Sequence, residues 1–410
     1  MAERSEKPMY SSAVRGVNTY SRALAAYLVP LEGESLVSHL RIVDKYSVVP
    51  ATTYLGAEFP QVLAKPEVDY KQANLTVPSI VQATFDPPEG RRPYDYVFDL
   101  TGEVRHDRTE MIQINTTCNV SRMLGQEAAK RKFTLPFYET TSKGSHDEKD
   151  DPKPEGTIGI WWHETLRMLA AIENLNLVIL RVGFVYGSYV EFGDITSAIT
   201  VGSVYGYLKK PMKSVWSPGK NPTNTLHAED LAGAAWALAQ WMDSLGRKEA
   251  DSLSGETILF HNDKSKVSQV EGMQPPDKKL IAPLFNLVDD SNSTLLSVGQ
   301  TVTSFFGTTF DFFNLGERTM YKFMDDAVED INEHHVGGWT QMIQNSNPPI
   351  PKTPLSAYMD KYALEKHVVA FNNTKIKEVI GYQLKRPHFN HDSIKEIVDK
   401  WKEEGSWPIL

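Results

Sequence analysis

The stretch "LNLVILRVGFVYG", residues 175–187, is almost continuously apolar and rich in β-branched side chains. A run of this kind, without alternation of polar and apolar residues, is typical of a central parallel strand buried on both faces. Upstream, strand-like and helix-like patterns alternate through residues 36–48, 94–104 and 109–132. Strand–helix alternation around one buried strand predicts a doubly wound α/β sheet.

Composition limits the partners that this protein can have. The 410 residues are 41% hydrophobic and 23% charged, which is enough for one large domain with a smaller appendage. The net charge of −9 argues against nucleic acid and anionic membranes, because both bind basic surfaces. No segment approaches the ~20 apolar residues of a membrane-spanning helix, and we expect that the first ten residues, which no apolar run follows, are not a secretory signal. We therefore expect a soluble, cytoplasmic protein.

Metal-binding patterns are sparse. The single cysteine, Cys118, excludes an intrachain disulfide framework and a multi-cysteine metal site. The adjacent His334 and His335 have neither a nearby cysteine nor the carboxylate spacing of a ligand set. We expect no bound metal.

The second half of the chain changes character after residue 290. Residues 305–339 read as helices rich in Phe and Met, so we expect a smaller, mostly helical region over 291–410. The aromatic residues there are core side chains in one interpretation and the wall of a binding cleft in another. The charged segment 143–156 reads as a solvated surface loop.

Five stretches together resemble a known family, the extended short-chain dehydrogenases/reductases of the NAD-dependent epimerase/dehydratase type. They are "RIVDK" (41–45), "INTTCNVSRMLGQEAAKRK" (114–132), "LVILRVGFVYG" (177–187), "NTLHAEDLAGAAWALA" (224–239) and "FNLVDD" (285–290). The resemblance implies a Rossmann-like domain over residues 1–290, with 188–222 contributing to a substrate lobe, and a helical cap over 291–410. It also implies NAD or NADP as cofactor, and dimerisation through two helices is common in the family.

The glycine-rich turn of that family is altered here. The family places glycines after its first strand, where the backbone and a helix N-terminus approach the pyrophosphate. The corresponding stretch is "RGVNTYS", residues 15–21, in which only Gly16 is retained. Arg15, Asn18 and Ser21 stand where glycines are expected, and Arg15 is a candidate partner for a phosphate.

The acidic residues near this turn give opposite indications about dinucleotide binding. Asp44 ends the second strand, where the resemblance places a carboxylate that binds the adenosine ribose. The alternative for Asp44 is a turn or capping residue. Asp99 and Glu103 bring negative charge to the segment that lines the cofactor in the family, which argues against ordinary dinucleotide binding.

The catalytic pair of the family is missing. A tyrosine and a lysine four residues apart share one helix face, and the lysine favours the phenolate near neutral pH. In "TIGIWWHETLRML", residues 157–169, Gly159 and His163 occupy these positions within a residue or so. The serine or threonine partner falls among Tyr138, Thr140 and Thr141. Ordinary short-chain dehydrogenase catalysis is therefore not expected.

Several residues are candidates for a catalytic role in place of the missing tyrosine–lysine pair. His163 titrates near neutrality and can act as general acid or base, with Glu164 beside it. Tyr138 and Glu139 follow a strand, where active-site residues of the family lie. Trp161 and Trp162 offer flat apolar surface for a substrate. In the alternative interpretation, the Trp and His side chains only fill a vacated cavity.

Further positions match the family without implying proton transfer. Tyr186 and His227 match positions that support substrate loops or structure, and His227 with Asp230 is expected to cap and orient the next helix. Arg181 ends a buried strand and is expected to pair with a carboxylate or the substrate at the sheet edge. We count Tyr186 and Arg181 among the candidate substrate-binding residues.

Three interpretations of function remain open. We favour an enzyme with this fold that performs non-redox chemistry, such as isomerisation, cyclisation or dehydration, on a small organic substrate. The first alternative is an NAD(P)-dependent epimerase, dehydratase or oxidoreductase with an atypical proton donor. The second is a non-catalytic scaffold, because cofactor and catalytic signatures are lost together.

Overall fold

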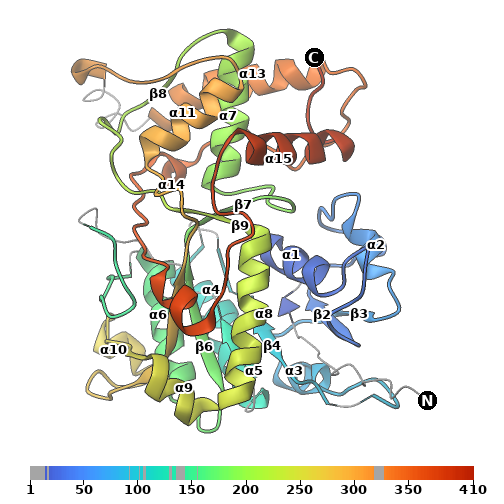
Figure 1. Ribbon diagram of the computed structural model, residues 1–410, viewed down its shortest axis with the longest axis vertical. Coiled ribbons are helices and arrows are strands. Elements are labelled where there is room, and N and C mark those ends of the chain that lie inside the picture. Colours follow the sequence, from blue (N-terminus) through green and yellow to red (C-terminus); the bar gives the residue numbers. More distant parts are fainter. Residues whose placement is uncertain are drawn as a thin grey trace.

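The chain forms a lower part built on a parallel sheet and an upper lobe of helices (Figure 1). The computed structural model describes residues 14–15, 18–91, 93–100, 102–104, 108–128, 132–134, 144–154, 156–317 and 327–410, with backbone alone for 14–15, 132–134 and 327. Within these residues, no helix has the length and apolarity needed to cross a membrane.

The sheet confirms the predicted doubly wound α/β class. Its strands are β1 (Val14–Arg15), β2 (Leu40–Asp44), β3 (Val68–Gln72), β4 (Val97–Asp99), β5 (Lys132–Thr134), β6 (Leu177–Val182), β10 (Gly255–Thr257) and β11 (Ile281–Leu287). Their order is β3-β2-β1 and β4-β5-β6-β11-β10, and β1 contacts β4. All pairs are parallel except β10–β11. The strand order therefore reverses between β1 and β4, which is where doubly wound sheets bind ligands.

Strand β6 is the buried central strand that the sequence predicts. All six of its residues are buried. Leu177 and Ile179 enter one hydrophobic core, whereas Val178 and Leu180 enter the other. Because side chains alternate along a strand, this division shows that both faces of the sheet are covered.

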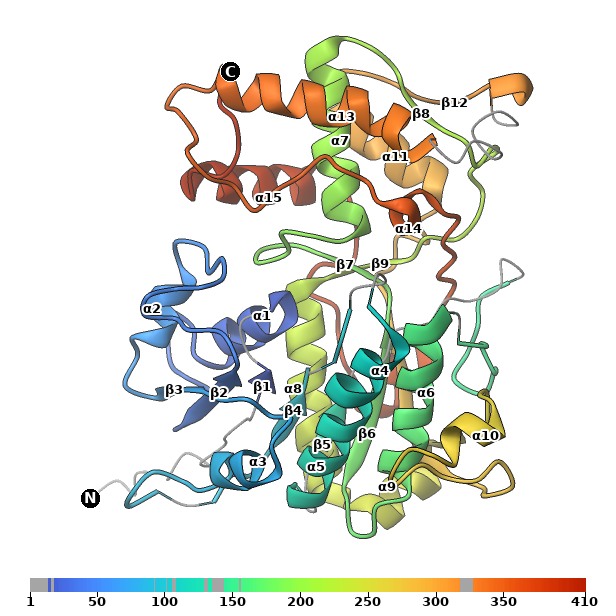
Figure 2. The same ribbon diagram turned by 180° about the vertical axis from the view of Figure 1, so that it is seen from behind.

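Helices cover the two faces of the sheet. On one face α1 (Thr19–Leu28) packs against α8 (Ala228–Leu245), which leads into α9 (Arg247–Ser254). On the other, α5 (Val120–Glu127) packs against α6 (Gly156–Ala170) and α3 (Pro78–Thr84), as Figure 2 shows. Two short helices lie outside these layers, α2 (Phe59–Leu63) and α10 (Lys264–Val267).

The helix expected over 109–132 is interrupted. It consists of α4 (Glu110–Gln113), a π-helical turn η1 (Ile114–Asn119) and α5. The wider turn directs the Thr117 hydroxyl to accept the backbone N–H of Glu103 at 3.0 Å. Such π-turns occur often at functional sites, and this one lies behind the segment that follows β4.

The upper lobe contains most of the helices that follow β6. It consists of α7 (Asp194–Leu208), α11 (Leu295–Phe305), α13 (Ala327–Gln344), α14 (Lys361–Leu364), α15 (His391–Glu403) and the parallel pair β8 (Met212–Ser214) and β12 (Phe310–Phe312). A second parallel pair, β7 (Phe184–Tyr186) and β9 (Thr225–His227), joins the lobe to the sheet. The π-turn η2 (Ile376–Ile380) returns to contact α8. The predicted domain boundary at residue 290 stays a prediction.

The expectation of a solvated loop over 143–156 holds for most of the described residues 144–154, but Glu148 is an exception. The Glu148 side chain is 4% exposed, and its carboxylate accepts the backbone N–H of Asn286 in β11 at 2.8 Å. The backbone N–H of His146 donates to Ala370 at 2.7 Å. Strand β10 ends before it can pair with this part of β11, so Glu148 supplies the partner that a buried N–H requires.

Candidate functional site

The turn after β1 is tied to the end of β4. Asn18 caps α1, and its side-chain oxygen accepts the backbone N–H of Ser21 at 3.0 Å. The side-chain amide of Asn18 donates to the carbonyl oxygen of Leu100 at 3.0 Å. This bridge crosses the point where the strand order reverses. Gly16 lies outside the described residues, and of Arg15 only the backbone is described.

A buried ion pair lies above the first turn of α1. Arg22 is 1% exposed, and its guanidinium donates to the Glu191 carboxylate and, at 3.0 Å, to the carbonyl oxygen of Tyr189. Burial raises the pKa of Glu191, and the Arg22 charge opposes that shift. The loop between β7 and α7 is thereby held against α1, as Figure 1 shows.

Trp162 fills the space beside the carboxyl end of β4. Gly102 has a φ of +123°, and a Cβ atom on it would lie 1.9 Å from Cζ2 of Trp162. The indole is 5% exposed. The side of α6 that faces the reversal point therefore presents Trp162, one residue before His163. Its neighbour Trp161 is also buried and donates from Nε1 to Glu110 Oε1 at 3.0 Å.

His163 is packed inside the protein. Its Nε2 lies 2.5 Å from the carbonyl oxygen of Leu259, and its ring lies against that of His261, with centroids 4.9 Å apart. Burial lowers the pKa of His163 to about 3, so the ring is neutral and donates its proton to the carbonyl. The structure gives His163 a packing role, and its assignment as acid or base stays a prediction.

Glu164 is likewise engaged within the core. Its Oε1 accepts the backbone N–H of His261 at 2.9 Å, and its Oε2 forms an ion pair with Nε of Arg167 at 3.1 Å. Burial raises the pKa of Glu164, whereas the backbone N–H and Arg167 lower it. Arg167 also donates to the carbonyl oxygen of Ile258. This network fixes α6 to the segment that follows β10.

The structure describes only some of the other candidate residues. Arg181 is buried, and its guanidinium donates to the backbone carbonyl oxygen of Asp150 at 3.5 Å. Tyr138 and Glu139, together with Thr140 and Thr141, lie outside the described residues. No observation tests the catalytic and substrate-binding assignments themselves, and they stay predictions.

The capping role of His227 is confirmed. Its Nδ1 accepts the backbone N–H of Glu229 at 3.2 Å, and Tyr186 packs edge-on against its ring. Asp230 has a different role from the one expected. Its carboxylate accepts the backbone N–H groups of Lys385 and Arg386, which holds the C-terminal segment against α8.

Asp289 makes folding stability depend on pH. Its Oδ2 accepts the Thr225 hydroxyl at 2.7 Å, and burial raises its pKa from 3.8 to about 6. A raised carboxyl pKa means that the folded state binds the proton more tightly. The resulting stabilisation is complete below about pH 4 and is lost as pH rises through about 6.

We expect Asp289→Asn, which cannot ionise, to gain in unfolding free energy relative to wild type between about pH 4 and pH 7. The expected gain is roughly 3 kcal/mol. Urea denaturation of both proteins across this range measures it. Parallel pH profiles of the two proteins would contradict the assignment.

The described residues around the reversal point do not fit a dinucleotide as they are arranged. Asn18 occupies a donor of the α1 N-terminus and Trp162 fills the space beside Gly102. Asp44 is buried, and its Oδ1 accepts the backbone N–H of Lys45 at 2.5 Å, as expected of a turn residue, whereas its ribose-binding role stays a prediction. Gly16 and the side chain of Arg15 lie outside the described residues, so the expectation of NAD or NADP as cofactor stays a prediction.

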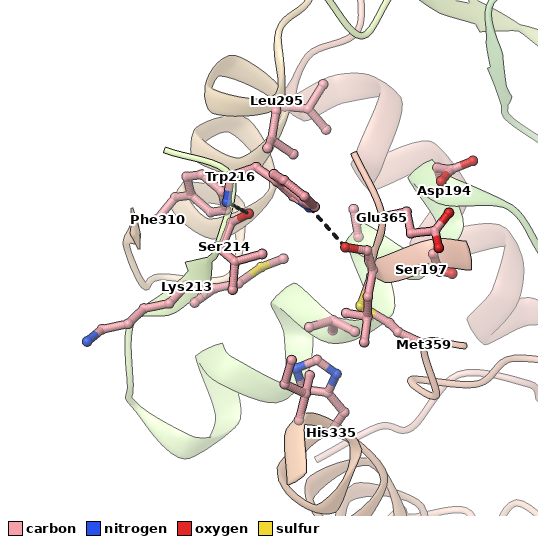
Figure 3. Close-up of a pocket in the computed structure, with 18 of the residues that line it drawn as sticks. Asp194, Ser197, Lys213, Ser214, Trp216, Leu295, Phe310, His335, Met359 and Glu365 are labelled. Carbon is pink, nitrogen blue, oxygen red and sulfur yellow. Dashed lines mark hydrogen bonds between the residues drawn. The ribbon is translucent and has the colours of Figure 1, made fainter. Parts of the chain in front are cut away.

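A large pocket lies instead in the helical lobe. It has a volume of about 1120 Å³ and is enclosed by α7, β8, α11, β12, α13 and α14. Figure 3 shows Trp216, Phe310, Met359 and the ring of His335 on its walls. Phe184 of β7 also lines it, next to the carboxyl end of β6. The volume suits a drug-sized molecule.

Sequence reasoning missed most of this pocket because its walls come from separate segments. The aromatic stretch after residue 304 was the available signal, and both of its interpretations hold. Phe310 and Phe313 line the pocket, whereas Phe305 and Phe306 pack against the core. Among the described residues, no group of His, Cys, Asp and Glu side chains is arranged to hold a metal ion.

No family model matches the chain, and no curated protein matches it in sequence. Solved structures do match over nearly its whole length. UDP-glucose 4-epimerase from Thermotoga maritima, solved with UDP-glucose, has a TM-score of 0.58 at 12% identity, covering 96% of this chain and 99% of that one. The dTDP-glucose 4,6-dehydratase from Bacillus anthracis, in complex with NAD, has a TM-score of 0.59 at 11% identity, covering 98% and 99%. A double mutant of the same kind of dehydratase from Streptomyces venezuelae, with NAD bound, has a TM-score of 0.57 at 13% identity, covering 97% and 99%.

The chain has the fold of these epimerases and dehydratases. The comparison supports the Rossmann-like architecture and the resemblance noted from the sequence. At such low identity it extends to the fold alone, because one fold hosts many chemistries.

Proposed function

We propose that this protein is an enzyme that converts a small organic substrate by proton transfer, without a bound nicotinamide. Isomerisation, cyclisation and dehydration are the reaction types in question. The observation that carries the proposal is the contact between Trp162 and Gly102, which takes up space at the point where this architecture binds its cofactor. The substrate site is then the pocket of the helical lobe.

A proton-carrying pair lines this pocket. The Tyr205 hydroxyl lies 3.3 Å from Nε2 of His335, on facing helices α7 and α13. Burial lowers the pKa of His335 to about 4, so its imidazole is neutral at pH 7. This pair supplies the acid and base that the reaction needs.

An NAD(P)-dependent epimerase or dehydratase is the second candidate. It is favoured by the fold, since the matching dehydratases bind NAD, and by the position of Asp44 at the end of β2. Under this alternative, Trp162 must move away from Gly102 to admit the cofactor.

The test is conversion of a panel of small cyclic alcohols and ketones in deuterium oxide, without added nicotinamide, followed by mass spectrometry. We expect a product with the elemental composition of the substrate, or that composition less one water, whose mass is raised by the deuterium that carbon has taken from the solvent. The matched control is Ser197→Trp, which places an indole in the pocket and should abolish conversion. Conversion only when NAD or NADP is added would favour the second candidate.

His335→Phe is expected to lower the rate of any such conversion by roughly 10²-fold or more, because general acid–base catalysis contributes about that much. The phenyl ring fills the space of the buried imidazole, so the fold should be retained. Steady-state kinetics beside circular dichroism separate the two effects. An unchanged rate would remove His335 from the proposed mechanism.

A further inference from the structure

The interior of the lobe pocket is apolar. Buried Val201 and Val298 and half-buried Phe310 and Met359 form its walls. Ligand sites with such walls bind largely through hydrophobic contact, with a few polar groups fixing orientation. The polar pair Tyr205–His335 lies among these walls.

Most charged residues of the pocket lie at its exposed rim, whereas Asp194 and Lys213 are half-buried. Lys210, Lys361 and Lys366 are exposed, as are the carboxylates Glu333 and Glu365. Figure 3 shows the ammonium group of Lys213 pointing away from the pocket. Among the described lining residues there is no arginine. A diphosphate needs concentrated cationic or backbone N–H donors, and opposite charges interspersed along an exposed rim do not supply them.

Trp216 presents its indole to the pocket in a fixed orientation. Its Nε1 donates to the carbonyl oxygen of Leu364 at 2.9 Å, and its backbone N–H donates to the Ser214 hydroxyl at 3.2 Å. Both bonds are drawn in Figure 3. An aromatic ring held in this way stacks on a flat ligand without losing further rotamer freedom.

We propose that this pocket binds an uncharged, ring-containing apolar molecule that carries a hydroxyl or carbonyl group and stacks on Trp216, rather than a sugar nucleotide. The inference rests on the proposed function only in taking this pocket as the substrate site. The ligand oxygen meets the Tyr205–His335 pair, and the ring lies among the apolar walls.

The test uses two probes, 2-naphthol and uridine diphosphate, titrated calorimetrically into the full-length protein. We expect 2-naphthol to bind with a Kd of about 100 µM or tighter and uridine diphosphate to give no heat. Trp216→Leu should weaken 2-naphthol binding roughly tenfold, because an aromatic stacking contact and its buried area are lost. The control is Lys395→Ala on α15, an exposed residue that does not line the pocket and whose loss should leave 2-naphthol binding unchanged.

Stability is checked by thermal melting of each variant. If Trp216→Leu fails to fold, Trp216→Phe keeps a stacking ring and should bind 2-naphthol within about threefold of wild type, whereas Ser197→Trp should abolish binding. Binding of uridine diphosphate would overturn the ligand class while leaving the pocket as the substrate site. If the Kd of 2-naphthol is unchanged by the substitutions at both Trp216 and Ser197, the probe binds elsewhere and the inference is overturned. Absence of 2-naphthol binding would also overturn it, yet a conversion found in the panel assay would leave the proposed function standing.

Discussion

Gly102→Ala is expected to lower the free energy of unfolding by roughly 3–5 kcal/mol, among the largest effects of a single methyl group in this chain. The added Cβ would lie 1.9 Å from Cζ2 of Trp162, and the φ of +123° is unfavourable for any L side chain. The indole cannot give way easily because it is buried against the end of β4. Urea denaturation monitored by circular dichroism measures the change.

Two comparisons isolate the steric part of this effect. Gly90→Ala is the matched control, because Gly90 has a φ of +75° with nothing within 4 Å of the added Cβ. It should cost only about 1 kcal/mol of backbone strain. In a Trp162→Ala background, Gly102→Ala should approach that smaller value. If Gly102→Ala costs no more than Gly90→Ala in the wild-type background, the indole does not lie where the structure places it.

Arg22→Ala is expected to cost roughly 3–5 kcal/mol of unfolding free energy, because it leaves the buried Glu191 carboxylate without its partner. The loss includes the hydrogen bond from Arg22 to the Tyr189 carbonyl oxygen. Replacing both charges, in Arg22→Met/Glu191→Gln, should recover much of the loss, since the desolvation of two ions disappears with them. Denaturation midpoints of the three variants give the comparison.

The exposed pair Lys395–Asp399 on α15 provides the control for Arg22. Lys395→Ala should leave the midpoint unchanged, because solvent screens a pair of this kind. A similar small effect for Arg22→Ala would mean that the loop between β7 and α7 is not held against α1 by this ion pair, and the crevice at the reversal point would then be open.

The parts of the fold that the sequence predicts are those encoded by local pattern. The run from Leu177 to Val182 is apolar except at Arg181 and forms the central strand. His227 precedes the helix that it caps. In both cases the physical reason lies within a few residues, where burial periodicity and capping chemistry can be read directly.

The parts that could not be predicted depend on contacts between distant segments. The burial of Trp162 follows from the absence of a side chain at Gly102, sixty residues earlier by their numbers. Glu148 lies in a run of charges that is typical of a surface loop, but an unpaired N–H in β11 draws it inside. The lobe pocket needs Trp216, Phe310 and Met359 together, and no single stretch contains them.

The most direct test of the account is calorimetric titration of the purified protein with NAD⁺, NADH, NADP⁺ and NADPH, after native mass spectrometry has checked for a retained nucleotide. With Trp162 over Gly102 and the α1 N-terminus capped by Asn18, we expect no retained nucleotide and no binding tighter than about 100 µM. Tighter binding of any one of the four would contradict the account and establish the protein as a nicotinamide-dependent member of its fold.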